Sequence, residues 1–187
     1  DGPGRPRWSE RGRTQRGWSG RSVDRRGAAA VSRSCSSIGG WHDRVMSIEV
    51  IYTAESTATG GGRDGHVKSS DDRLDLDTRP PKAAGGSGDG TNPEQLFSAG
   101  YAACFLGALR LVAKNDKIAI DDATGITAQV GLGKDPNGGF GINAHLIGYL
   151  PGLEQSVADE LMNKAHQFCP YSKATRGNID VTLEAKV

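Results

Sequence analysis

Two cysteines, Cys104 and Cys169, are the residues best suited to redox chemistry between residue 46 and the end of the chain. Cys104 lies in a nearly unbroken apolar run, residues 91–109, and Cys169 directly precedes Pro170 at the end of a helical pattern. A cysteine in an apolar helix is most often a small core residue. Here, however, small residues around Cys104 leave space that a core would normally fill: Gly100, Ala103, Gly107 and Ala108. A small substrate could therefore approach this sulfur, with Cys169 as a candidate disulfide partner or resolving thiol.

A reactive Cys104 also needs a neighbour that stabilises its thiolate, because a buried thiol has a raised pKa and reacts slowly. Arg63, in the glycine-rich turn of residues 57–65, is a cation that a flexible loop could fold over a pocket. An arginine in a loop is by default a solvated charge, but Glu94 could orient this one through a bidentate pair. On a straight helix Glu94 and Cys104 would lie roughly 15 Å apart and on different faces, so direct contact would need a break or a loop between them, and a long arginine could bridge them.

The histidines allow other kinds of site. His166 lies three residues before Cys169, one helical step away, so a Cys–His nucleophile or half a metal site is conceivable. No second pair of ligands has suitable spacing, so we expect no metal and expect His166 on the polar side of its helix. His66 and His145 have the pattern of ordinary strand residues. The glycine-rich segment 82–90 lacks the GK[ST] and GxGxxG motifs of phosphate-binding loops.

Ahead of Cys104, the sequence predicts three strands and then a long helix. Residues 48–53, 66–70 and 73–78 alternate as strands do, with a hairpin joining the first two. Thr91 and Glu94 fit a capping box at the start of the helix, and Pro93 fits its first turn: these three residues mark where the helix begins. Apolar and small residues then continue to position 113 and leave no wide polar face, which predicts a buried core helix rather than a membrane span.

After this helix, the sequence predicts a second hairpin, another helix and a last strand. The hairpin spans residues 123–134 and 139–150, the amphipathic helix residues 153–168, and the strand residues 178–187. This order is neither regular βαβ alternation nor an all-β pattern, so we expect an α+β fold. A helix that is apolar all round needs cover from more than one side, which predicts a homodimer around it.

Residues 1–45 differ in composition from the rest. They hold ten Arg, no Lys and four acidic residues, and all three Trp, whereas residues 46–187 carry thirteen basic and eighteen acidic groups. Such an Arg-, Gly- and Ser-rich segment cannot build a core. Three interpretations compete: a disordered artefact of a start assigned upstream of Met46, which we favour, a targeting presequence, and a nucleic-acid-binding arm.

Three blocks of sequence carry a resemblance to a known family. TGGGRDG, TNPEQLFSAGYAACFLGALR and FCPYSKATRGNIDV closely resemble the organic hydroperoxide resistance (Ohr) proteins of the OsmC superfamily, over residues 46–187. The resemblance implies an OsmC-like fold, with antiparallel sheets around a long buried central helix, in an intertwined homodimer with two sites at the subunit interface. It also implies a thiol-dependent peroxidase acting on organic and fatty-acid hydroperoxides. One departure is that three glycines precede Arg63 where the family usually has two.

The same resemblance implies roles for individual residues. Cys104 would be the peroxidatic cysteine and Cys169 the resolving one, while Arg63 and Glu94 would hold Cys104 as a thiolate. The aromatic residues that could line an apolar substrate channel are Phe97, Tyr101, Phe105 and Phe140. A lipoylated protein or dihydrolipoamide would be the external reductant, with no bound cofactor, no membrane or nucleic-acid partner, and a bacterial-type cytoplasmic location.

The implied reaction begins when the Cys104 thiolate attacks the distal peroxide oxygen, giving an alcohol and a sulfenic acid. Cys169 then condenses with the sulfenic acid, and a dithiol reduces the resulting disulfide. Two other classes compete with this prediction. A Cys–His hydrolase would depend on His166, and an Arg-rich nucleic-acid-binding protein with a structural α+β domain would depend on residues 1–45.

Overall fold

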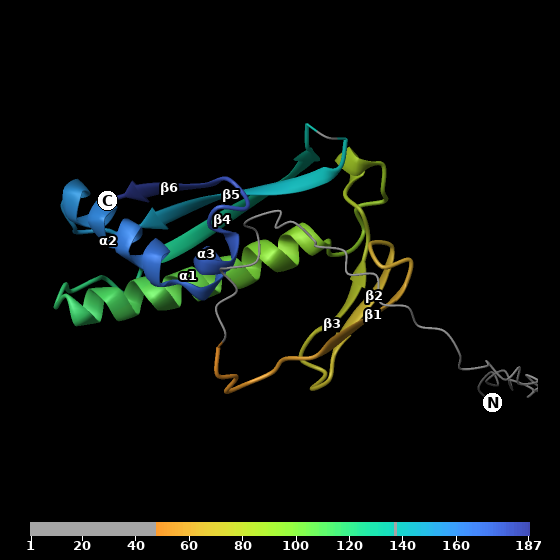
Figure 1. Cartoon of the computed structure of the whole chain (residues 1–187), viewed down its shortest axis with the longest axis horizontal. Helices are drawn as coiled ribbons and strands as arrows, with labels where there is room; N and C mark the ends of the chain where they lie inside the picture. The colour runs from red at the N-terminus through yellow and green to blue at the C-terminus, as the bar shows by residue number, and fades with distance from the viewer. Residues whose placement is uncertain (1–47, 137) are drawn as a thin grey trace, which may run out of the picture. The chain divides into compact units, whose positions relative to one another are not determined.

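The computed structural model describes residues 48–136 and 138–187, and residues 50–187 form one compact unit. The boundary near Met46 and all three interpretations of residues 1–45 lie outside the described residues. Within them the chain is α+β, as predicted, with two three-stranded sheets, three α-helices and a short 3-10 helix, Lys82–Ala84 (Figure 1).

The first sheet is small and antiparallel, in the order β1-β2-β3. Its strands are β1 (Ser56–Gly60), β2 (Gly65–Ser69) and β3 (Asp75–Thr78). The turn from β1 to β2 carries Arg63 and requires glycine at Gly65, where an added Cβ would lie 2.1 Å from the Thr59 carbonyl oxygen. The predicted strand at residues 48–53 is wrong, because no described strand pairs with these residues. They leave large apolar side chains exposed: Ile48, Val50, Ile51 and Tyr52.

The second sheet is mixed, in the order β4-β5-β6. The predicted hairpin is confirmed as β4 (Gly125–Lys134) and β5 (Phe140–Tyr149), which pair antiparallel, but β6 (Val181–Lys186) pairs parallel to β5. The parallel pairing arises because two helices, α2 (Gln155–Phe168) and α3 (Pro170–Thr175), form a crossover between β5 and β6. The sequence predicted α2 but not α3.

The central helix, α1 (Pro93–Asn115), starts one residue later than its predicted cap implied. Asn92 is the N-cap: its Oδ1 accepts from the Gln95 N–H at 2.9 Å, and Gln95 Oε1 accepts from the Asn92 N–H at 3.0 Å. This reciprocal pair is a capping box. The predicted box of Thr91 and Glu94 is therefore wrong, and Glu94 has no capping role.

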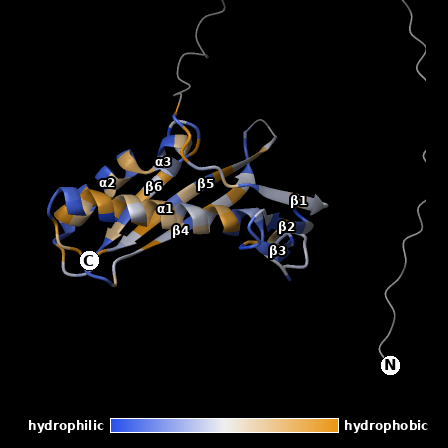
Figure 2. Cartoon of the chain, turned by 90° about the horizontal axis from the view of Figure 1, so that it is seen from below, coloured by the Kyte–Doolittle hydropathy of each residue, from blue (hydrophilic) through white to orange (hydrophobic). Residues whose placement is uncertain are grey.

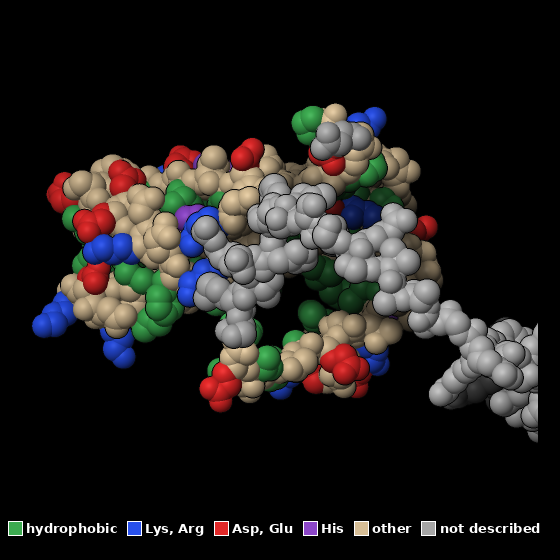
Figure 3. Space-filling model, viewed as in Figure 1, with side chains coloured by type: hydrophobic (Ala, Val, Ile, Leu, Met, Phe, Trp, Pro, Cys, Tyr) green, Lys and Arg blue, Asp and Glu red, His purple; other side chains and the backbone are tan. Residues whose placement is uncertain are grey.

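One side of α1 is buried and the other is open within this chain. The helix contacts β4, α2 and α3, and its buried residues are Tyr101, Phe105, Ala108, Leu109, Val112 and Ala113. Exposed small or apolar residues recur every four positions on another side: Ala99, Ala103, Gly107 and Leu111. Apolar and small residues run along the helix (Figure 2), and other hydrophobic side chains reach the surface (Figure 3). The prediction of burial all round is thus wrong for the single chain.

Among the described residues, α1 is also the one helix long and apolar enough to cross a membrane. Core helices of soluble proteins pass the same test, so this is weak support for a span. The contacts of α1 with β4 and α2 are those of a core helix, and the apolar core gathers where these elements meet.

Candidate functional site

The structure brings the two predicted redox residues together. Cys169 Sγ lies 3.5 Å from Cys104 Sγ, although 65 positions separate them in sequence. Both are free thiols. Cys104 on α1 is half-buried, whereas Cys169, at the junction of α2 and α3, is fully buried. Because a disulfide bond is about 2.05 Å long, a movement of roughly 1.5 Å would let the two sulfurs bond.

The surroundings of Cys104 within one chain favour its thiol form. Burial raises the pKa of Cys104, a backbone hydrogen bond from Tyr171 partly opposes this, and the neighbouring Cys169 raises the pKa further. An N–H donor stabilises negative charge on sulfur. Tyr171 is thus a site residue that the sequence analysis missed. Its place two residues after Cys169 was the only signal available.

The predicted pair of Arg63 and Glu94 forms, with an unexpected geometry. Arg63 Nη2 donates to both Glu94 Oε1 and Oε2, at 2.8 Å each, so a single nitrogen bridges the carboxylate instead of a two-pronged fork. Glu94 can accept both bonds because Gln95 caps the helix. The Glu94 side chain is 15% exposed and the Arg63 side chain 46% exposed, so the arginine remains open to an additional partner.

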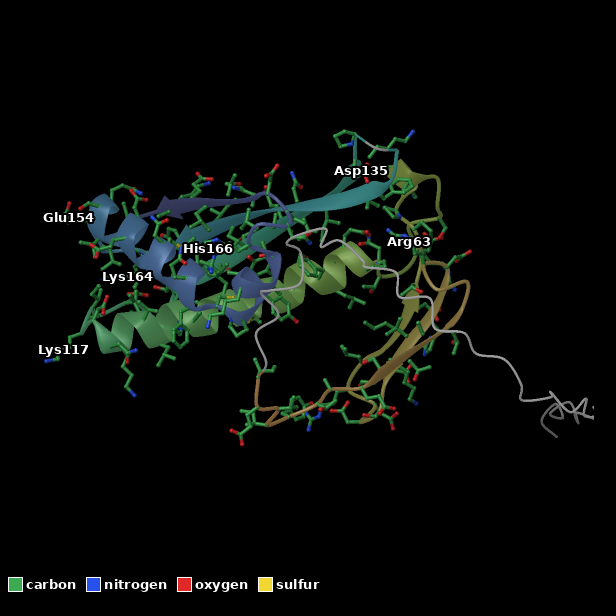
Figure 4. The ribbon with its side chains drawn as sticks, viewed as in Figure 1. Arg63, Lys117, Asp135, Glu154, Lys164 and His166 are labelled. Carbon is green, nitrogen blue, oxygen red and sulfur yellow. The ribbon has the colours of Figure 1, made fainter. Side chains whose placement is uncertain are left out.

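This ion pair stands apart from the cysteines of the same chain. Helix α1 is continuous from Pro93 to Asn115, so the ten residues from Glu94 to Cys104 span about 15 Å along its axis. Figure 4 shows Arg63 near the start of α1 and well separated from His166, which is three residues from Cys169. The described contacts therefore form two pairs, Cys104 with Cys169 and Arg63 with Glu94. The predicted bridge from Arg63 to Cys104 is not made within one chain.

Of the four aromatic residues predicted to line a substrate channel, Phe97 and Tyr101 contact each other on α1, with ring centroids 5.8 Å apart, whereas Phe140 lies on β5. Tyr101 and Phe105 are fully buried, and Phe140 is 75% exposed at the start of β5. Phe97 lies between them in exposure, and its ring stacks on Tyr171 with centroids 6.0 Å apart. Their role in substrate binding stays a prediction.

A cavity of about 370 Å³ opens beside the start of α1, and none of the four aromatics lines it. Its walls mix apolar residues with the capping amides and Glu94: Pro81, Ala83, Ala84, Asn92, Glu94, Gln95, Ser98, Val130 and Leu132. The cavity therefore adjoins the Arg63–Glu94 pair, not the fully buried aromatics of the core.

His166 is half-buried and contacts a serine. Its Nδ1 lies 2.9 Å from Ser172 Oγ, whereas Cys169 Sγ contacts Cys104. Burial and then the charge of Arg176 lower the pKa of His166. His166 thus lies at the border between the buried and polar sides of α2, and the geometry favours a thiol pair over a Cys–His nucleophile.

The two other histidines among the described residues, His66 and His145, are paired with carboxylates. His66 lies 2.9 Å from both Asp75 and Asp77, and the hydrogen bond to Asp77 is the main cause that raises its pKa. His145 lies between Thr182 and Glu184 on the second sheet. In the described part of the chain, no group of three or more His, Cys, Asp or Glu residues is placed to hold a metal ion.

Comparison with known proteins identifies the family of the chain. The family model described as OsmC-like protein matches residues 86–184. An organic hydroperoxide resistance protein of Xanthomonas axonopodis pv. citri is 54% identical over 136 residues, which cover 72% of this chain and 94% of that protein. The organic hydroperoxide resistance protein OhrB of Bacillus subtilis is 54% identical over 137 residues, which cover 73% and 98%.

Solved structures give the same result. The crystal structure of Bacillus subtilis OhrB matches with a TM-score of 0.67, covering 73% of this chain and all of that one, at 54% identity. An organic hydroperoxide resistance protein from Legionella pneumophila matches with a TM-score of 0.70 and 47% identity, covering 74% and 100%. The chain therefore belongs to the OsmC-like family and, within it, to the organic hydroperoxide resistance (Ohr) proteins.

Proposed function

We propose that the chain is a cysteine-based peroxidase that reduces alkyl and fatty-acid hydroperoxides to alcohols. Membership of the Ohr group supports a role in resistance to organic hydroperoxides. The observation that carries the finer proposal is the 3.5 Å contact between a half-buried Cys104 and a fully buried Cys169. One sulfur is open to a substrate, and the other is in place to react with the product formed on it.

The proposed cycle has three steps. The Cys104 thiolate attacks the distal oxygen of the hydroperoxide, the O–O bond breaks, and the departing alkoxide takes a proton to become an alcohol. The sulfenic acid on Cys104 then condenses with the Cys169 thiol, which forms the disulfide and releases water. An external dithiol reduces this disulfide by two exchange reactions and is itself oxidised to a disulfide.

A second copy of the chain would complete the site. Cys104 needs a positive neighbour to be a thiolate, whereas its own Arg63 is held by Glu94 about 15 Å away along α1. In the homodimer that we propose, Arg63 and Glu94 of one subunit approach Cys104 of the other. The exposed apolar residues of α1 and of residues 48–52 provide surface for such an intertwined contact.

The dimer can be tested with Gly107→Glu. A Cβ added at Gly107 meets nothing within 4 Å, and glutamate is a better helix former than glycine, so the single chain tolerates the change. A charge in an apolar helix contact is not tolerated. We expect the variant to sediment as a monomer and to lose peroxidase activity, with Ser156→Glu, at an exposed position of α2, as the dimeric control. A dimeric, fully active Gly107→Glu protein would exclude this interface.

The function itself is tested by stopped-flow kinetics. We expect rapid reduction of an alkyl hydroperoxide, slower reduction of hydrogen peroxide, and sustained turnover with dihydrolipoamide but not with thioredoxin. The expected substrates and the lipoyl reductant come from the family resemblance. The same resemblance supports the proposed cytoplasmic location. Absence of peroxide consumption under all these conditions would refute the proposed activity, while turnover with thioredoxin alone would refute only the proposed partner.

A further inference from the structure

A buried cluster of hydroxyl groups joins three helices beside the two cysteines. The Tyr101 hydroxyl on α1 lies 3.0 Å from Ser172 Oγ and 3.1 Å from Thr175 Oγ1, both on α3. Ser172 Oγ also lies 2.9 Å from Nδ1 of His166 on α2. Tyr101 and Ser172 are fully buried, and Thr175 is 7% exposed. One tyrosine hydroxyl thus links α1 to two positions of α3.

Every hydroxyl of this cluster can be satisfied at once. Thr175 donates to the Tyr171 carbonyl at 3.0 Å and can accept from Tyr101. Tyr101 can accept from Ser172, which in turn can accept from the His166 ring. A fully satisfied buried network fixes the geometry of the elements it joins, because each displaced group would be left unpaired away from water. The network therefore holds α3 in one position against α1.

The position of α3 against α1 also sets the distance between the sulfurs of Cys104 and Cys169. Tyr101 lies one helical turn before Cys104, and Ser172 lies three residues after Cys169. Tyr171, next to Ser172, contacts α1 at two places. Its backbone N–H donates to Cys104, and its ring lies over Gly100. A Cβ added at Gly100 would stand 3.1 Å from the Tyr171 hydroxyl oxygen, so the two helices are in close contact here.

We propose that Tyr101, Ser172 and Thr175 are positioning residues that make Cys169 resolve the Cys104 sulfenic acid before a second peroxide reaches it. This inference rests on the proposed peroxidase function. The sulfenic acid has two fates: condensation with the Cys169 thiol, which releases water, or attack on a second hydroperoxide, which gives a sulfinic acid and an alcohol. The network bears most directly on the first fate, because it fixes the place of Cys169. It therefore sets the ratio of disulfide to sulfinic acid.

Thr175 offers a matched pair of variants. Thr175→Val keeps the shape and removes the hydroxyl, whereas Thr175→Ser keeps the hydroxyl. For the valine variant we expect roughly a threefold to tenfold slower disulfide formation, as for the loss of one hydrogen bond, and a matching rise in sulfinic acid per turnover. Tyr101→Phe, which cuts both links from α1, should raise the sulfinic fraction further. Serine at position 175 should restore the wild-type ratio.

The measurements are rapid-quench mass spectrometry of Cys104 after one equivalent of alkyl hydroperoxide, and the Cys104–Cys169 equilibrium in a dithiothreitol redox buffer. The second needs no peroxide, so it reports on positioning even if the wild-type chain is no peroxidase. Val112→Ala, in the buried part of α1 beyond the cysteines, controls for lost stability. If Thr175→Val and Tyr101→Phe lower the melting temperature like Val112→Ala but change neither the sulfinic fraction nor the redox equilibrium, the hydroxyls are structural and the proposal fails.

Discussion

Cys104→Ser is expected to lower peroxide consumption to the uncatalysed background, while Cys169→Ser is expected to keep the first turnover and lose the cycle. The reason is the order of the chemistry: a hydroxyl at position 104 is a far weaker nucleophile than a thiolate, whereas position 169 acts only after the sulfenic acid exists. The two changes are equally conservative. They therefore separate the attacking thiol from the resolving one.

Stopped-flow loss of hydroperoxide over one equivalent and over many equivalents distinguishes the two variants. In Cys169→Ser we expect one rapid equivalent, followed by accumulation of sulfinic acid on Cys104 that mass spectrometry can detect. Cys35→Ser, outside the described residues, is the thiol control and should leave the rate unchanged. Full activity in Cys104→Ser would refute the proposed mechanism. Equal loss of the first turnover in both variants would refute the assignment of Cys104 as the attacking thiol and Cys169 as the resolving thiol.

Two inactive variants, Arg63→Ala and Cys104→Ser, are expected to restore activity to one another when refolded together. In a mixed dimer the intact Cys104 of one subunit meets the intact Arg63 of the other, so one of its two sites is complete. Random pairing of equal amounts makes half of the dimers mixed, and about a quarter of the wild-type sites should return. If Arg63 served the Cys104 of its own chain, no mixed dimer would hold a complete site.

The control for this experiment is a mixture of Cys104→Ser with Cys169→Ser. These two residues meet within one chain at 3.5 Å, so pairing the variants in a dimer completes no site. Sustained turnover with a dithiol reductant is the readout for both mixtures. No recovery in the Arg63→Ala mixture, with mixed dimers confirmed by native mass spectrometry, would place the whole site in a single subunit.

The sequence predicted well those helices and strands that depend mainly on interactions between residues close together in the chain. The period of α2, the second hairpin and the start of α1 to within one residue all follow from contacts between near neighbours in the chain. The strand at residues 48–53 failed for the opposite reason. Apolar and polar residues alternate there as in a strand. A strand also needs a neighbouring strand for its hydrogen bonds, and the described residues of the single chain provide none.

The sequence likewise singled out some residues of the candidate site and missed others. Residue type, spacing and family resemblance singled out Cys104, Cys169, Arg63 and Glu94; the structure pairs them two by two, and their catalytic roles stay predictions. The contacts of Tyr171 and Ser172 were not predicted, because a backbone N–H and a buried hydroxyl find their partners only in the folded structure. The start of α1 shows that two neighbouring capping boxes can fit the same sequence. Asn92 and Gln95 match the pattern as well as Thr91 and Glu94 do. Because the cap lies one residue later than predicted, Glu94 pairs with Arg63 instead.

The placement of Cys169 between two helices has a mechanical consequence. Its backbone, at φ −57° and ψ 127°, is not helical, so α2 ends and α3 begins on either side of a single extended residue. A change in the side-chain torsion of Cys169 can bring its sulfur the remaining distance to Cys104, while its backbone N–H and C=O stay bonded to Ala165 and Lys173. Neither helix has to unwind to accommodate the disulfide. The proposed cycle between dithiol and disulfide would then need only a local movement of this side chain.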